Sequence, residues 1–164
     1  MSDTKAQDIR LRPADLDDCR RIWEWRNEAT TREASFDTNP VPYLNHHAWF
    51  SQKMKDPNTN IFIVENAVGN RIGYVRFDVE GAEAEISVSL DRNERGKGYG
   101  TTAIRRGAEE MISTGSAERI IALVKAGNLA SMSAFQRAGF VVQATRQTSG
   151  ADSHTLVYDG VQPS

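Results

Sequence analysis

The chain has 164 residues, the size of one ordinary domain, which excludes two independent cores. Its 20 Lys and Arg residues nearly balance 22 Asp and Glu residues, and the net charge of −2 argues against a general nucleic-acid-binding protein. No apolar run approaches the roughly 18 residues of a membrane span. A single cysteine fits a reducing cytosol, and the first residues lack the apolar stretch of a signal peptide. We therefore expect a cytoplasmic protein that binds neither nucleic acid nor membrane; the sequence leaves a homodimer open.

The first part of the chain is predicted to be mainly helical. A short alternating strand is predicted over residues 9–13, and Asp15 is expected to cap a helix that continues to about Asn27. The apolar face of this helix is predicted to contain Leu16, Cys19, Ile22 and Trp23. Residues 28–42 are predicted to form a loop or broken helix, and loops of this length are often functional. A second helix is predicted over residues 43–55, followed by Asp56-Pro57.

The remainder of the chain alternates between strands and helices. Three strand-like runs over residues 61–65, 71–79 and 83–90 predict an antiparallel meander with short turns. Helices are predicted over residues 99–113 and 128–137, and strands over residues 119–124, 140–144 and 155–158. This order implies at least one parallel pair. We expect one α/β domain over residues 9–159, with a mixed sheet of six to seven strands and about four helices, between a flexible segment at 1–8 and a polar tail at 160–164.

The segment between the third strand of the meander and the next helix is rich in glycine and basic residues. Gly96, Gly98 and Gly100 would let main-chain N–H groups approach a ligand without a Cβ clash, and the helix N-terminus adds its dipole. Arg92, Arg95 and Lys97 add positive charge. This combination predicts a phosphate site, the alternative being a glycine-rich helix cap with surface charges. The Walker motif of nucleoside-triphosphate hydrolases is absent, and the half-polar strand before the turn fits a dinucleotide-binding unit poorly.

Two blocks of residues resemble the GNAT superfamily of acetyl-CoA-dependent N-acetyltransferases. The first is Arg95-x-x-Gly98-x-Gly100, and the second runs from Asn128 through Ser131 and Phe135 to Gly139-Phe140. The resemblance implies acetyl-CoA as co-substrate and a sheet splayed at its centre, where the pantetheine arm enters between the strands at 83–90 and 119–124. The coenzyme contacts that it implies are Leu90, Arg95, Gly96, Lys97, Gly98, Tyr99, Gly100, Thr101, Asn128, Ser131 and Phe135.

Residues of the first half are similar to a narrower branch, which acetylates amino-sugar nucleotides in pseudaminic acid synthesis, and less closely to acetyltransferases of ribosomal-protein N-termini. The similarity lies in Trp25-Arg26-Asn27, Arg32, Ser35-Phe36, Pro40-Val41-Pro42 and His47-x-Trp49-Phe50. It implies a UDP-linked 4-amino-4,6-dideoxy sugar as acceptor, bound through Arg26, Asn27, Arg32, His47 and Trp49. A protein N-terminus, a small-molecule amine, or a CoA-binding regulatory domain without turnover are the alternatives.

Acetyl transfer to an amine requires a group that removes a proton from the amine. Glu85 on the polar side of its strand is our candidate for this base; the alternative is an ordinary solvated strand face. At the position where the family often has a tyrosine as acid, this chain has Phe135, which cannot donate a proton. Tyr99, Ser131, Ser133 or water could replace it, or no acid is needed. Adjacent His46 and His47 lack the spacing and partners of a metal site, so we expect no metal.

Overall fold

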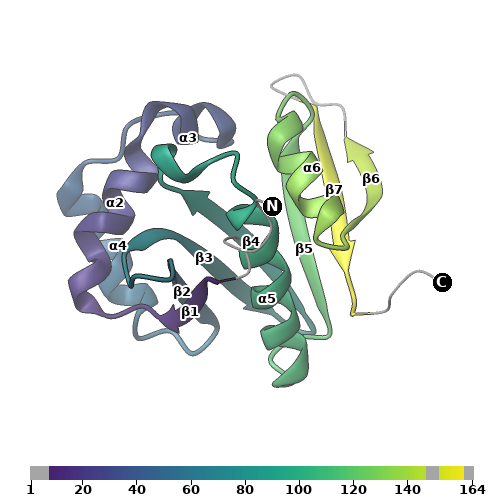
Figure 1. Ribbon diagram of the computed structural model, residues 1–164, viewed down its shortest axis with the longest axis horizontal. Helices are drawn as coiled ribbons and strands as arrows, with labels where there is room; N and C mark the ends of the chain where they lie inside the picture. Colours follow the sequence, from purple (N-terminus) through teal and green to yellow (C-terminus); the bar gives the residue numbers. More distant parts are fainter. Residues whose placement is uncertain (1–7, 147–151, 161–164) are drawn as a thin grey trace.

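The computed structural model describes residues 8–146 and 152–160 as a seven-stranded sheet with helices on both faces (Figure 1). The strand order is β1-β2-β3-β4-β5-β7-β6. Most of the predicted N-terminal segment at 1–8 and tail at 160–164 lies outside the described residues. The elements are β1 (Arg10–Pro13), the short 3₁₀ helix η1 (Leu16–Asp18), α2 (Cys19–Asn27), α3 (Ala29–Ala34), α4 (Tyr43–Lys53), β2 (Thr59–Glu65), β3 (Arg71–Glu80), β4 (Glu83–Leu90), η2 (Arg92–Glu94), α5 (Tyr99–Ser113), β5 (Arg119–Lys125), α6 (Leu129–Arg137), β6 (Val141–Arg146) and β7 (Ser153–Tyr158).

The predicted mixed sheet is confirmed. Strands β1 to β4 form an antiparallel meander, so β1 extends the predicted set of three. The parallel pair is β4 with β5, and β7 joins β5 and β6 by antiparallel pairing. The described residues contain five α-helices, because the predicted loop at residues 28–42 includes α3. This short helix begins where the Glu28 carboxylate accepts the N–H groups of Thr30 and Thr31.

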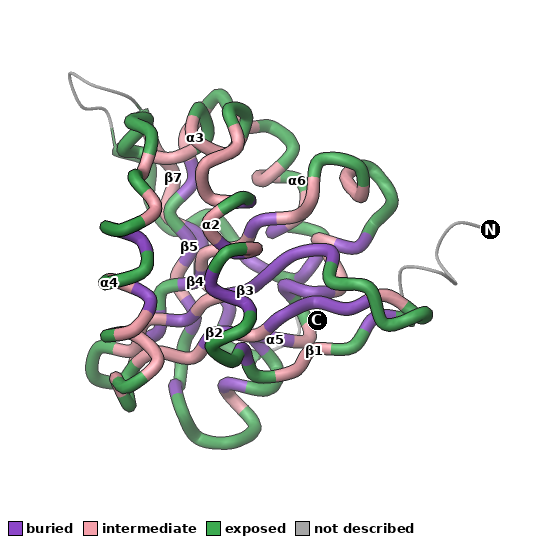
Figure 2. The backbone as a smooth tube through the Cα atoms, turned by 90° about the vertical axis from the view of Figure 1, so that its left-hand side faces the viewer, coloured by how far each residue is buried: buried purple, intermediate pink, exposed green. Residues whose placement is uncertain are grey.

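The sheet separates two cores. One core lies between the sheet and α5 and contains Val75, Phe77 and Ile104, while the other lies beneath α2 and α4 and contains Phe50 and Tyr74. Buried residues concentrate on the central strands (Figure 2). Because successive residues of a strand point to opposite faces, Tyr74 and Val75 pack into different cores. No described helix is both long enough and apolar enough to cross a membrane.

The prediction for the first helix was right about its start and about the burial of Cys19 and Ile22, wrong about Leu16, and it missed Trp25. Asp15 does cap this segment, but the first turn is the 3₁₀ helix η1 and α2 follows it. The change from three residues per turn to 3.6 rotates the apolar stripe, so Leu16 is 69% exposed. Trp25 is buried in the core, whereas Trp23 is half-buried and donates its indole N–H to the carbonyl of Val41.

Strands β4 and β5 are paired at only one of their ends. Their register joins Glu83 to Arg119, Ala84 to Ile120 and Glu85 to Ile121. Both strands continue beyond these pairs, β4 to Leu90 and β5 to Lys125. The sheet is therefore splayed between residues 86–90 and 122–125, as the family resemblance implied (Figure 1).

A buried carboxylate fixes the junction of β1, η1 and β3. Asp18 is 1% exposed and accepts hydrogen bonds from Arg12 at 2.8 Å and 3.0 Å, from Arg71 at 3.1 Å and from the N–H of Asp15 at 2.9 Å. Burial alone would raise the pKa of Asp18, but these hydrogen bonds outweigh it and lower the pKa to about 2. The ionised carboxylate is thus part of the folded structure.

Replacing Asp18 with asparagine should lower the free energy of unfolding by about 3–5 kcal/mol, because Arg12 and Arg71 lose a buried partner. The folded pKa of Asp18 lies below the ordinary value of 3.8, so its contribution is complete above that pH and is lost as the pH falls toward 2. Urea unfolding of wild type and variant at neutral pH and in acid measures both effects. Asp17→Asn, at an exposed neighbour, is the control; equal stability of the two variants would contradict this assignment.

Candidate active site

The splayed strands open into a cavity of about 370 Å³. Its walls come from the end of β4, the glycine-rich turn, the start of α5, and from α3 and α6. Nine of the residues predicted to contact a coenzyme line it, namely Leu90, Arg95, Gly96, Gly98, Gly100, Thr101, Asn128, Ser131 and Phe135. Two blocks of the sequence that are about 30 residues apart therefore form one site.

The glycine-rich turn presents main-chain donors to this cavity. Gly96 and Gly98 have φ angles of 76° and 87°, in the left-handed region that glycine adopts most readily. Gly98 is the N-cap of α5, and no described side chain caps the helix there. The first N–H groups of α5 consequently remain without an intrahelical or side-chain acceptor, beside residues that line the cavity. This geometry suits a phosphate group.

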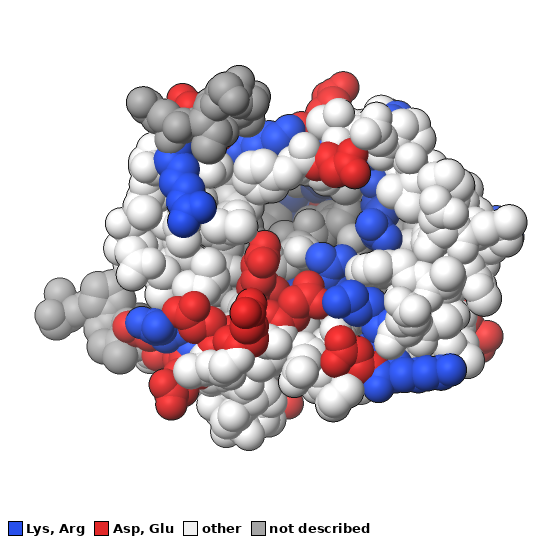
Figure 3. Space-filling model, turned by 180° about the vertical axis from the view of Figure 1, so that it is seen from behind, with Lys and Arg blue, Asp and Glu red and all other residues white. Residues whose placement is uncertain are grey.

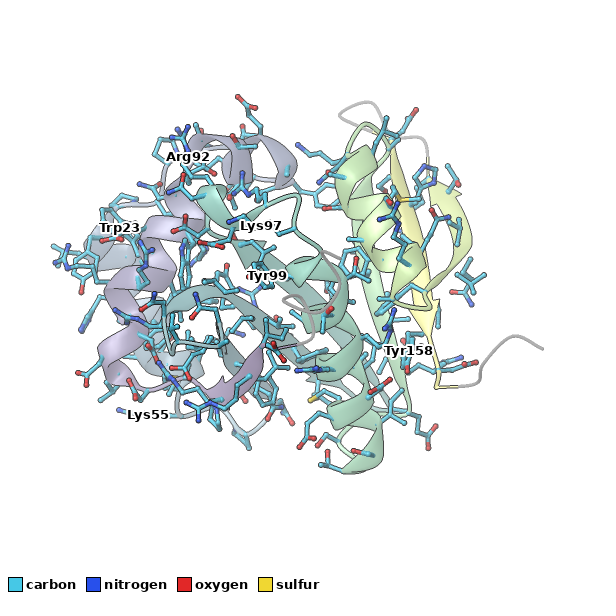
Figure 4. All side chains as sticks on the ribbon, in the orientation of Figure 1. Trp23, Lys55, Arg92, Lys97, Tyr99 and Tyr158 are labelled. Carbon is cyan, nitrogen blue, oxygen red and sulfur yellow. The ribbon has the colours of Figure 1, made fainter. Side chains whose placement is uncertain are left out.

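The side chains of two residues predicted to contact the coenzyme do not line the cavity. Lys97 is exposed and its ammonium group pairs with Glu94 at 3.2 Å. Tyr99 is 8% exposed, because the first turn of α5 buries this position against the sheet. Figure 4 labels both residues at the start of α5. Neither residue lines the cavity, so the charge of Lys97 and the hydroxyl of Tyr99 are not among the groups that surround it.

Arg95 lines the cavity but already has partners. Its guanidinium donates to the Glu28 carboxylate at 3.0 Å, to the Thr31 hydroxyl at 3.1 Å and to the Leu90 carbonyl. Burial would raise the pKa of Glu28, but Arg95 and two N–H groups lower it to about 2. On the opposite side of the opening, Lys125 of β5 donates to the carbonyl of Glu33 at 3.1 Å. The segment that contains α3 is therefore bonded to both sides of the splay.

The helix α6 supplies the remaining wall of the cavity. The Asn128 side chain accepts the N–H of Ser131 at 3.2 Å and so caps α6. Phe135 is 4% exposed and its ring meets Phe140 edge-on, with the ring centroids 5.1 Å apart. The side chain that faces the cavity at this position is a hydrocarbon, so it offers no proton to a leaving thiolate.

Glu85 lies where the pairing of β4 with β5 ends. It is exposed, and its cross-strand neighbour on β3 is Asp78. The surrounding carboxylates are already paired, Glu83 with Arg119 at 2.6 Å and Asp78 with Arg76 at 2.9 Å. Within the described part of the chain Glu85 has no ion pair or side-chain hydrogen bond, so no other side chain occupies its carboxylate.

Two guanidinium groups lie over one indole ring on the same face of the sheet. The central carbon of Arg26 is 4.3 Å from the ring centroid of Trp49, and that of Arg76 is 5.0 Å from it. Arg76 also donates to Ser87, the cross-strand residue two positions from Glu85. The surface is hollowed near its centre on this side of the molecule, with acidic and basic side chains on the rim (Figure 3).

His46, rather than the predicted His47, is the histidine that contacts this cluster. His46 is fully buried, with Nε2 2.9 Å from the carbonyl of Cys19 and Nδ1 3.1 Å from the Arg26 guanidinium. A carbonyl only accepts, so Nε2 carries the proton and Nδ1 accepts from Arg26. Burial lowers the pKa of His46 to about 4, which keeps the ring neutral at neutral pH. His47 is exposed beside Tyr43.

Asn27 and Arg32 hold the main chain of residues 28–42 together. The Asn27 side chain accepts the N–H of Val41 at 2.8 Å. Arg32 donates to the carbonyl of Asn27 at 3.1 Å and to that of Thr38 at 3.4 Å. Arg32 therefore has partners in its own loop, and the expected pairing of Arg26 with Arg32 stays a prediction. Of the five predicted acceptor contacts, Arg26 lies over the ring of Trp49, and Arg32 bonds the main chain of Asn27.

A model of the acetyltransferase (GNAT) domain family matches residues 8–141 of the chain, which is more than half of its length. The chain belongs to the GNAT family. The resemblance that rested on the glycine-rich turn and the Asn128–Phe140 block is thereby confirmed at the level of the family. A search of curated protein sequences gave no match.

Solved structures with the same fold agree with the GNAT assignment. Spermidine N-acetyltransferase from Vibrio cholerae, in complex with CoA and spermine, has a TM-score of 0.83 at 19% identity, covering 92% of this chain and 95% of that one. The yncA protein from Salmonella typhimurium with its cofactor acetyl-CoA has a TM-score of 0.79 at 22% identity, covering 95% and 96%. Aminoglycoside acetyltransferase AAC(6′)-Ib in complex with coenzyme A has a TM-score of 0.79 at 19% identity, covering 93% and 95%.

This GNAT domain is an acetyl-CoA-dependent N-acetyltransferase that acts on an amine. Family membership favours the enzyme over a CoA-binding regulatory domain. Among the described residues no three or more His, Cys, Asp or Glu side chains are grouped to hold a metal ion.

Three residues in or near this site were not predicted as site residues, namely Arg76, His46, and Ser89, which lines the cavity. Arg76 and Ser89 both belong to polar positions of alternating strands, so the alternation that predicts β3 and β4 also marks them as sharing a face. No local signal distinguishes them from solvated positions. His46 cannot be told from His47 without the packing of α4 on α2.

Proposed function

We propose that this enzyme transfers the acetyl group of acetyl-CoA to the primary amine of a UDP-linked 4-amino-4,6-dideoxy sugar. In this proposal the coenzyme pyrophosphate binds the N–H groups at Gly98–Gly100, and the pantetheine arm enters between β4 and β5. The acceptor amine approaches from the face that carries Trp49. Glu85 removes its proton through a bound water, and the neutral amine attacks the thioester carbonyl.

The observation that carries the proposal for the acceptor is the guanidinium of Arg26. Among the described residues it has no carboxylate partner, and its pKa is lowered by burial. A buried cation without a counter-ion is destabilising, and an anionic ligand removes that cost. Arginine binds phosphate oxygens through two parallel hydrogen bonds, which suits the diphosphate of a nucleotide sugar. Neutral His46 holds the guanidinium from behind without neutralising it.

The alternative acceptors fit these charges less well. Spermine, which is bound in one structural neighbour, and the aminoglycosides, after which another neighbour is named, are polycations that need free carboxylates. Asp78 is bonded to Arg76 and Lys53, and Glu83 to Arg119, which leaves Glu85 as the unpaired carboxylate of these three. A protein N-terminus carries no diphosphate for Arg26 to bind. A negatively charged acceptor is therefore the better match to this face.

Replacing Arg26 with alanine should raise the KM for the UDP-amino sugar by about 10- to 100-fold, the loss of one charged hydrogen bond or more. The KM for acetyl-CoA should stay near that of wild type, because the coenzyme phosphates bind at the glycine-rich turn on another part of the site. The difference between variant and wild type should shrink as salt is raised. Steady-state kinetics with each substrate varied in turn, at low and high salt, measures the two KM values and their dependence on salt.

Arg20→Ala is the matched control, since Arg20 also lies on α2 with its guanidinium 4.4 Å from an aromatic ring centroid, that of Tyr43, but is exposed. It should leave the sugar-nucleotide KM unchanged. Spermidine and an N-terminal peptide are assayed in parallel. Normal turnover of the UDP-amino sugar by Arg26→Ala, or a strong preference of wild type for spermidine, would reject the proposed acceptor.

A further inference from the structure

The cavity wall contains a serine whose hydroxyl is unused. Ser89 of β4 is 7% exposed and lines the cavity. Its Oγ is shielded from solvent and has no hydrogen-bond partner in the described part of the chain. Buried hydroxyls without a partner destabilise a folded protein, and native proteins keep few of them. One that borders a binding cavity is best explained by a partner that arrives with the ligand.

Ser89 also differs from the other polar residues that line the cavity, because it alone among them is buried. The side chain of Arg95 is already hydrogen-bonded to Glu28, and that of Asn128 caps α6. A hydrogen bond to a ligand is strongest where water is excluded. Ser89 is therefore placed to make a strong contact with a ligand that fills the opening.

The neighbouring strand fixes the position of Ser89. Gly73 of β3 approaches β4 so closely that a Cβ there would lie 2.4 Å from the Ser89 carbonyl oxygen. The cross-strand partner of Ser89 is Tyr74, whose ring stacks on Trp25 with the ring centroids 6.1 Å apart. Tyr74 makes no hydrogen bond to Ser89. Packed in this way, β4 holds the serine at the mouth of the splay, four residues from Glu85. At about 3.3 Å per strand residue, the Cα atoms of Ser89 and Glu85 are roughly 13 Å apart along β4.

We propose that the Ser89 hydroxyl donates a hydrogen bond to the acetyl thioester of the bound coenzyme. As the amine nitrogen bonds to the carbonyl carbon, the electron pair of the C=O double bond moves to oxygen, and Ser89 stabilises that negative charge. When the pair returns, the C–S bond breaks, the nitrogen of the new amide releases its extra proton to water, and the CoA thiolate takes a proton from water. The inference requires acetyl-CoA in the cavity, as the proposed function does, but is independent of the acceptor.

The test uses full-length Ser89→Ala and Ser89→Cys, with hydroxylamine as a small nucleophile and release of the free CoA thiol as the signal. We expect kcat to fall by about 10²-fold in Ser89→Ala, and less in Ser89→Cys, which keeps a weak donor. The affinity for CoA, measured by calorimetry, should be unchanged. The melting temperature without ligand should stay the same or rise, since an unsatisfied hydroxyl has been removed.

The control is Ser113→Ala, at the far end of α5, where the hydroxyl already donates to the carbonyl of Glu110. Ser89→Ala with kcat within about twofold of wild type would overturn the proposal. So would a parallel loss of CoA affinity at constant kcat, because Ser89 would then only hold the coenzyme. Failure of wild type to bind CoA would instead reject the coenzyme placement of the proposed function. Failure of the UDP-amino sugar as acceptor leaves this test unaffected.

Discussion

Replacing Gly98 with valine should abolish the rise in melting temperature that acetyl-CoA causes in the wild-type protein. Gly98 has a φ of 87°, which a β-branched residue adopts only with strain, and it lies in the wall of the cavity at the start of α5. The new side chain would also stand where a phosphate must approach the main chain. Wild type at 100 times the dissociation constant should gain about 2.7 kcal/mol of stability, and the variant none.

The strain itself must be separated from the loss of the site. Gly115, which follows α5, has a φ of 76° and no atom near the place of a Cβ. Gly115→Val should therefore lower the melting temperature of the unliganded protein for the same backbone reason, yet keep the full shift on addition of acetyl-CoA. A thermal scan of the three proteins, each with and without coenzyme, measures this. An intact shift in Gly98→Val would show that the coenzyme phosphates bind elsewhere.

Replacing Glu85 with glutamine should slow turnover by about 10²- to 10⁴-fold, the range expected for a general base. Glutamine keeps the shape of the side chain and removes its capacity to accept a proton. The binding of acetyl-CoA should be almost unchanged, because Glu85 lies beyond the residues that line the cavity. Part of the lost rate should return at high pH, where more of the amine is already neutral.

Glu83→Gln is the matched control on the same strand and face. Its carboxylate pairs with Arg119, so its loss should leave turnover close to wild type. Single-turnover kinetics across a range of pH distinguish the two, since they report the chemical step rather than product release. Equal rates for Glu85→Gln and wild type in that experiment would remove Glu85 as the base.

Local sequence signals were sufficient for much of the fold and for the coenzyme side of the site. The strict alternation of residues 83–90 predicted β4 with its observed bounds, and residues 99–113 likewise predicted α5. The glycine-rich turn was predictable because both the glycine conformations and the helix start are encoded within a few residues. The side chains of Lys97 and Tyr99 do not line the cavity, because Lys97 pairs with Glu94 and the ring of Tyr99 packs into the core, so their contact with a coenzyme stays a prediction.

The acceptor side depended on packing between distant segments, which a single sequence does not encode locally. Arg26, Trp49 and Arg76 come from α2, α4 and β3, and only the assembled layers bring them together. The role of Arg32 in binding the acceptor stays a prediction; in the structure Arg32 donates to carbonyls of its own loop, next to the helix that Glu28 caps. Histidines that are adjacent in sequence diverge into buried and exposed positions for the same reason.

The splay has a consequence for the solubility of the protein. Residues 86–90 and 122–125 form two sheet edges that face each other without pairing, and unpaired edges readily recruit strands from other chains. Here Arg95 and Lys125 tie the segment containing α3 across the opening, while α6 covers its other side. The same helices that shape the coenzyme cavity therefore protect the molecule from edge-to-edge aggregation.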